Sequence, residues 1–128
     1  MSIPKLIRSY TCSADVAAKR IVKFSDAAST SKVAQAAANT DPLWGVSDAM
    51  GGKSGGLVDV IVSGLAEVQL GGSVNAGDPI TSDGSGKGVA CAGAAGETRR
   101  IVGYAEAPGV AGDIIQIVVD RGVLQLPA

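Results

Sequence analysis

The stretch LVDVIVSG, residues 57–64, and its near-copy IIQIVVDRG, residues 114–122, decide how this sequence is expected to fold. Both are rich in Val and Ile, which favour strands, and both end at a glycine. VDVIV in the first aligns with IQIVV in the second at an offset of 115 − 58 = 57 residues. Two matching strands far apart in one chain raise the question of whether the whole sequence is duplicated.

Further matches surround these strands in the same order. They are Ser25-Asp26 with Ser82-Asp83 (82 − 25 = 57), Lys32-Val33-Ala34 with residues 87–90 across a small gap, Gly45-Val46 with Gly103-Tyr104 (103 − 45 = 58), and Gln69-Leu70 with Gln125-Leu126 (125 − 69 = 56). The nearly constant offset predicts two similar halves, about 22–70 and 79–126. Independent hairpins that share turn residues are the alternative explanation.

Each half contains several short strand patterns separated by turns with Gly or Asp. About eight or nine strands with such turns predict a mainly β protein, a compact β-barrel or sandwich-like domain built from two similar halves. The helix candidates are two short stretches, SADVAAK (13–19) and VAQAAA (33–38). We expect one β-rich domain over residues 13–128, with Phe24 and Trp44 in its core, and an extended N-terminal arm over residues 1–12.

Composition removes several classes of function. A net charge of −1 offers no basic field for nucleic acid, and no apolar run reaches the ~20 residues that span a membrane. The N-terminus lacks a secretory signal pattern, so we expect a cytoplasmic site of synthesis. The chain has no His, which removes the common nucleophile systems. Cys12 and Cys91 are expected to be free thiols, and we expect no enzyme, metal or cofactor.

The glycine-rich loop in PITSDGSGKGVA, residues 79–90, tests a phosphate-binding interpretation. A P-loop around Lys87 would need Gly at position 81 and Ser or Thr at position 88, but the sequence has Thr81 and Gly88. Asp83-Gly84 is instead typical of a hairpin turn. A lipoyl- or biotinyl-type carrier domain, modified at Lys87 or Lys32, remains an alternative, although the usual neighbours of a carrier lysine are absent.

The N-terminal segment SIPKLIRSY, residues 2–10, lies outside the predicted repeat. It combines apolar side chains with two positive charges, a pattern that favours an arm that becomes ordered on a partner surface. The predicted contact residues are Ile3, Lys5, Leu6, Ile7, Arg8 and Tyr10. A terminus without a binding role is the alternative.

Three blocks of the sequence, residues 45–70, 76–90 and 100–119, resemble the capsid decoration (head cement) proteins of tailed bacteriophages. The second block, AGDPITSDGSGKGVA, carries much of the resemblance, and the third contains RIVGYAEAPGVAGD. The resemblance implies a non-enzymatic virion protein that binds the outer face of the expanded capsid and stabilises contacts between major capsid subunits.

The resemblance also implies partners and a location. The partners would be the major capsid protein and further copies of this chain, as a homotrimer or alternatively a dimer, with no nucleic acid and no membrane. The protein would lie on the capsid exterior after assembly in the host cytoplasm. A tail- or fibre-associated β module is a second interpretation, and the carrier domain is a third.

Overall fold

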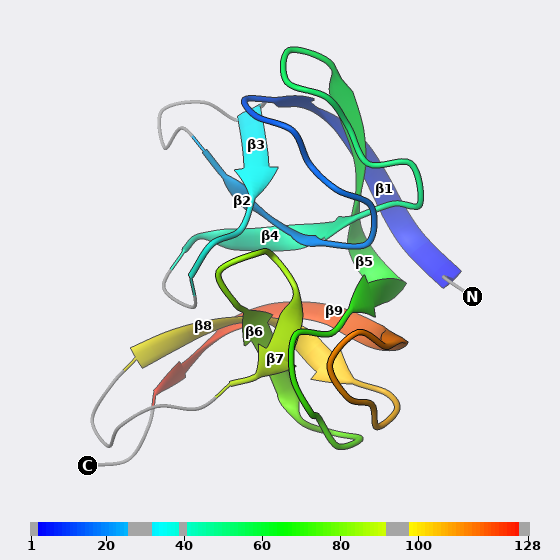
Figure 1. Cartoon of the computed structure of the whole chain (residues 1–128), viewed down its shortest axis with the longest axis vertical. Helices are drawn as coiled ribbons and strands as arrows, with labels where there is room; N and C mark the ends of the chain where they lie inside the picture. The colour runs from blue at the N-terminus through cyan, green and yellow to red at the C-terminus, as the bar shows by residue number, and fades with distance from the viewer. Residues whose placement is uncertain (1–2, 26–31, 39–40, 92–97, 126–128) are drawn as a thin grey trace.

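A computed structural model describes residues 3–25, 32–38, 41–91 and 98–125, and the strands it contains are drawn in Figure 1. They are β1 (Ile3–Cys12), β2 (Ile21–Phe24), β3 (Lys32–Gln35), β4 (Leu43–Ser47), β5 (Leu57–Gln69), β6 (Pro79–Ser82), β7 (Gly88–Ala90), β8 (Thr98–Ala105) and β9 (Ile114–Gln125). The predicted mainly β fold is confirmed.

Neither of the two predicted helix candidates is helical. Residues 13–19 form bends and turns around a bridge, and residues 33–35 belong to β3. Over the described ranges, the chain contains no helix long and apolar enough to cross a membrane.

The first five strands close into a barrel, which is the upper part of the molecule in Figure 1. β1 pairs in parallel with β3 and antiparallel with β5, and β2 and β4 complete the ring through antiparallel pairs. Alternate residues of each strand point inward, as the pleat requires. The buried core of this barrel consists of Tyr10, Cys12, Val16, Val22, Val33, Val58, Val60 and Val62, with Phe24 and Trp44 packed against it.

A second barrel uses the other end of β5. Beyond Gly64, which has a φ of +96°, β5 leaves the first barrel and pairs antiparallel with β9. Strands β9, β8, β6 and β7 follow in order, and a parallel bridge between Leu70 and Gly88 returns to the end of β5. In Figure 1, β5 runs from the upper barrel into the lower one.

The two barrels have the same strand pairing. Tyr10 pairs with Val58 in the first, and Val68 pairs with Ile115 in the second, at offsets of 68 − 10 = 58 and 115 − 58 = 57. An isolated bridge also recurs, between Val16 and Gly52 and between Val74 and Gly109 (offsets 74 − 16 = 58 and 109 − 52 = 57). The predicted two similar halves are therefore confirmed.

The boundaries of the two halves differ from the predicted ones. Residues 3–12 are extended as expected, but they form β1, the first strand of the first barrel, and do not stand apart from the domain. The end of β5 lies within the predicted first half, residues 22–70, but it is the structural equivalent of β1 and opens the second barrel. This equivalence lies in backbone pairing and not in residue identity, so sequence matching missed it. The Ser25-Asp26 match is also displaced. Val22 pairs with Gly45 and Ile80 pairs with Gly103, so Val22 corresponds to Ile80 (80 − 22 = 58) and Ser25 to Asp83. Asp26 lies outside the described residues.

The repeated glycine of the matched motifs has a structural cause. A Cβ atom on Gly45 would collide with the backbone oxygen of Ile61, and a Cβ atom on Gly103 would collide with that of Val118. Ile61 and Val118 are themselves equivalent (118 − 61 = 57), so the same close approach of two strands occurs in each barrel. Only glycine allows this approach at either position.

The second barrel is attached end-on to the outer surface of the first. Ile21, Leu43, Val46 and Ile61 point outward from the first barrel and join the buried core of the second. At the edge of this contact, the N–H of Ile21 donates to the oxygen of Gly86 at 2.8 Å. Because apolar side chains of one barrel complete the core of the other, the two form one continuous domain.

Candidate functional site

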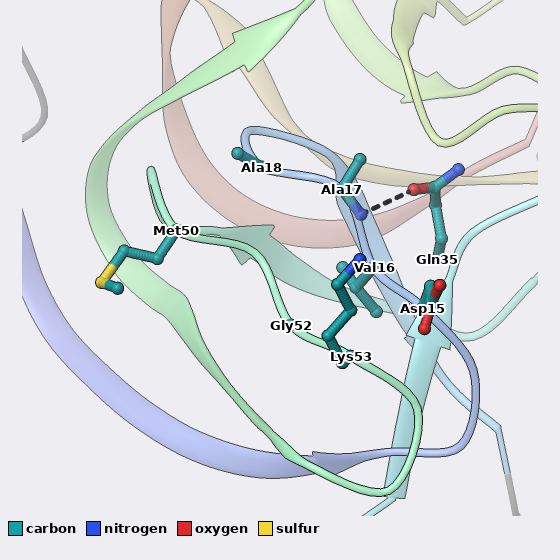
Figure 2. Close-up of a pocket in the computed structure, with 8 residues that line it drawn as sticks. All are labelled: Asp15, Val16, Ala17, Ala18, Gln35, Met50, Gly52 and Lys53. Carbon is teal, nitrogen blue, oxygen red and sulfur yellow. Dashed lines mark hydrogen bonds between the residues drawn. The ribbon is translucent and has the colours of Figure 1, made fainter.

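The hollow drawn in Figure 2 shows no catalytic arrangement. It has a volume of about 430 Å³ and lies beside the Val16–Gly52 bridge. The Gln35 Oε1 atom accepts the N–H of Ala17, as the dashed line shows, and a carboxylate oxygen of Asp15 accepts the N–H of Ser54. These side chains therefore stabilise loops. Among the described residues, no group of three or more His, Cys, Asp or Glu side chains gathers to hold a metal.

The two cysteines are free thiols, as expected. Cys12 lies in the core of the first barrel, where burial raises the pKa of its thiol and the nearby Asp15 carboxylate raises it further. Burial also raises the pKa of Cys91, although Arg99 opposes the shift. A thiol held in its protonated form is a poor nucleophile. Cys12 packs in the core of the first barrel, and Cys91 is half-buried.

The glycine-rich loop is a hairpin turn, as predicted, and it packs against the other barrel. One carboxylate oxygen of Asp83 accepts the N–H groups of Ser85 and Lys87, at 2.8 Å and 3.0 Å. Gly86 has a φ of +74°, and a Cβ atom there would press on the side chain of Gln35. The loop therefore belongs to the contact between the barrels, where Lys87 is half-buried. Lys32, the other lysine of the carrier alternative, is exposed.

The six predicted contact residues of β1 have different environments. Leu6 and Ile7 are 50% and 46% exposed, and Arg8 is also exposed. The backbone of Ile3 pairs with Leu65, whereas the side chains of Ile3 and Lys5 lie outside the described residues. Tyr10 is only 2% exposed, so its prediction as a surface contact is wrong. The alternation of β1 directs its ring into the barrel.

Tyr10 belongs to an aromatic plug, defined here as Tyr10, Phe24 and Trp44. The Trp44 Nε1 donates to the Tyr10 hydroxyl at 2.8 Å, and the rings of Phe24 and Trp44 lie 4.8 Å apart. Two guanidinium groups cover the plug, that of Arg121 at 4.3 Å from the Trp44 ring centre and that of Arg8 at 5.4 Å from the Tyr10 ring centre. The core role predicted for Phe24 and Trp44 agrees with this packing.

Apolar residues also gather on the outside of the sheet, in a patch that we call the outer apolar face. It consists of Leu6, Ile7, Leu65, Tyr104 and Val118. Leu65 pairs with Val118, and Val118 pairs with Tyr104, so the three share one side of the sheet. Sequence analysis identified Leu6 and Ile7 but missed Leu65 and Val118. The signal was present in IIQIVVDRG, where apolar residues occupy both faces of the strand.

A shallow groove of about 330 Å³ borders this face where the two barrels meet. Ile7 and Ile61 line it, and an ion pair between Lys19 and Glu67, 3.9 Å apart, bridges the barrels there. Ile7 therefore has charged residues beside it at this groove. An exposed apolar patch rimmed by polar residues is the surface pattern of a protein contact.

Comparisons with known proteins show a relation at the level of the fold. No protein-family model and no curated protein matches this sequence. Among solved structures, the chain is similar to the crystal structure of the head fiber gp8.5 N base in bacteriophage phi29, with a TM-score of 0.67 and 21% sequence identity. The match covers 94% of this chain and 98% of that one. The two chains therefore share a fold over almost their whole lengths.

Proposed function

We propose that this protein is a non-enzymatic structural protein of a bacteriophage virion, which binds the outer surface of the expanded capsid and stabilises contacts between major capsid subunits. The observation that carries the proposal is the match in fold, over almost the whole chain, to the base of a phage head fiber. The resemblance of residues 45–70, 76–90 and 100–119 to decoration proteins supports the same location independently. The expected location is the capsid exterior, after assembly in the host cytoplasm.

The capsid contact that we propose is the exposed surface of β1. Leu6 and Ile7 supply apolar area, and Arg8 supplies a positive charge for an acidic capsid surface. Ile3 and Lys5 extend the same strand and remain predicted contacts. Many copies bound to a symmetric lattice gain strength from their number, so a shallow contact surface is sufficient. Further copies of this chain, as a homotrimer or a dimer, are the other expected partner.

A second candidate function, the base of a head fibre, is favoured by the description of the structural neighbour as such a base. The two functions make different demands on the capsid contact. A decoration protein bridges neighbouring capsid subunits and raises the resistance of the shell to heat. A fibre base needs only to attach, and its opposite end must carry the rest of a fibre.

Mixing the purified protein with expanded, undecorated capsids tests both candidates. Saturable co-sedimentation with a gain in capsid heat resistance is expected for a decoration protein, whereas binding without that gain would favour the fibre base. Ile7→Asp should weaken binding, while Met50→Asp, at a loop residue 89% exposed, should not. An absence of saturable binding to any capsid form would contradict the proposal.

A further inference from the structure

A groove between the two barrels combines aromatic side chains with positive charge. It has a volume of about 360 Å³ and is lined mainly by Phe24, Pro42, Trp44, Arg100, Ile101 and Arg121. Arg121 is held in place because it donates to the backbone oxygens of Trp44 and Val62, at 3.0 Å and 2.5 Å. Arg100 is exposed and has no ion-pair partner among the described residues. Aromatic walls with arginines suit an aromatic residue accompanied by carboxylates.

The same chain carries a group of that chemistry on its surface. Of the two tyrosines, Tyr10 is buried and Tyr104 is 41% exposed. Glu106 follows Tyr104 by two residues, just beyond the end of β8, and Asp120 follows its cross-strand partner Val118 by two residues on β9. Both acidic residues are exposed.

The residues equivalent to Tyr104 and Val118 lie on the outer surface of the first barrel, where their burial can be compared. They are Val46 and Ile61 in the first barrel (104 − 46 = 58 and 118 − 61 = 57), and the second barrel buries both. In the second barrel the surface has kept its apolar side chains and gained a larger one, yet Tyr104 and Val118 stay 41% and 43% exposed, and none of the residues that the structure describes buries them. A terminal repeat that stays unpartnered ordinarily has a polar outer face.

We propose that Tyr104 enters the groove of a second copy of this chain, and that the second copy returns its own Tyr104 to the first. Ile101 of the groove and Tyr104 lie on one strand, about 10 Å apart at 3.3 Å per residue, which is close enough for one twofold axis to relate both contacts. Glu106 of one copy then lies near Arg100 of the other, twice in each pair. The complementary charge of the two surfaces selects a second copy as the partner, and the reciprocal contact around a twofold axis favours the dimer over the homotrimer.

Sedimentation equilibrium and native mass spectrometry of the purified full chain, without capsids, test the contact. The wild type should form a dimer, and Tyr104→Lys should weaken it at least about 30-fold, the effect of losing a central contact. Val110→Lys, a loop residue that is 57% exposed, should leave the dimer unchanged. Circular dichroism verifies that each variant remains folded.

Charge reversal gives a sharper test. Arg100→Glu and Glu106→Arg should each weaken the dimer about tenfold, because each places two like-charge pairs in it. An equimolar mixture of the two variants should form a heterodimer of nearly wild-type strength, since both pairs then again join opposite charges. A monomeric wild type, a dimer that Tyr104→Lys leaves intact, or a mixture without preference for the heterodimer would overturn the proposal. These measurements are made without capsids, so their outcomes do not depend on whether the protein binds a capsid.

Discussion

The two barrels have the same strand pairing, but one end of each is filled in a different way. In the first barrel, Tyr10, Phe24 and Trp44 form the aromatic plug. The equivalent positions of the second barrel hold the smaller residues Val68, Ser82 and Val102 (68 − 10, 82 − 24 and 102 − 44 are each 58), and the outer surface of the first barrel covers that end. Strand pairing therefore constrains the backbone, while the choice between internal filling and external packing depends on a few side chains.

Removing the largest side chain of the plug should produce the largest difference between the barrels. We expect Trp44→Ala to lower the free energy of unfolding by about 3–5 kcal/mol, because it empties the end of the first barrel. Val102→Ala, at the equivalent position, removes less volume and should cost about 2 kcal/mol, from about 0.8 kcal/mol per methylene and a small cavity term. Urea unfolding measures both. Equal losses would mean that the plug does not distinguish the barrels.

Gly45 and Gly103, at which two strands approach closely, should lose similar stability when each is replaced by alanine. Gly45→Ala and Gly103→Ala each place a Cβ atom against a backbone oxygen of the adjacent strand, which side-chain rotation cannot relieve. We expect each to lower the free energy of unfolding by about 1–3 kcal/mol, the usual range for overpacking. Gly84→Ala, where a Cβ atom would meet nothing within 4 Å, is the control. A loss in only one of the two would show that the barrels are less equivalent than their pairing indicates.

The Tyr10 hydroxyl accepts from Trp44 inside the plug, and this polar contact has no counterpart at the equivalent residues Val68 and Val102 of the second barrel. Tyr10→Phe leaves the Trp44 Nε1 without its acceptor, so we expect a loss of about 1–2 kcal/mol in the free energy of unfolding. Tyr104→Phe removes the hydroxyl of an exposed ring and should change it by less than about 0.5 kcal/mol. Thermal unfolding at a concentration at which the chain is monomeric compares the two, and similar losses would contradict the role of the hydrogen bond.

The smallest effect concerns a backbone position that both barrels place in the left-handed region. Lys19 has a φ of 57°, and the equivalent Gly77 has a φ of 89° (77 − 19 = 58). We expect Gly77→Ala to cost about 1 kcal/mol, because a Cβ atom disfavours this conformation. Lys19→Gly relieves the same strain but loses the contact with Glu67, so the free energy of unfolding should stay within about 0.5 kcal/mol. Urea unfolding would contradict this explanation if Gly77→Ala proved neutral.

Much of the fold could be predicted from particular residues of the sequence, whereas the candidate contact surface could be predicted only in part. The β-branched strands and the turn at Asp83 each carry a local preference that survives in the folded chain, although the positive φ of that turn lies at Gly86 and not at Gly84. The matched glycines were predicted from their nearly constant offset, and their cause is a contact between strands. Leu6 and Ile7 were identified because they stand in a mixed apolar and basic segment. Tyr10, in the same segment, proved to be core, because the alternation of β1 and the opposite strand decide which side chains are buried.

The sequence by itself determined that the chain is mainly β, that it is duplicated, and where its main turns lie, because these properties follow from residues acting locally and from matches at a constant offset. Only the tertiary structure decided that β5 serves both barrels, that β1 corresponds to the end of β5, and that Tyr104 and Val118 stand exposed where Val46 and Ile61 are buried. These features depend on which strands pair and which surfaces meet, and such contacts join residues too distant in the chain for local patterns to specify.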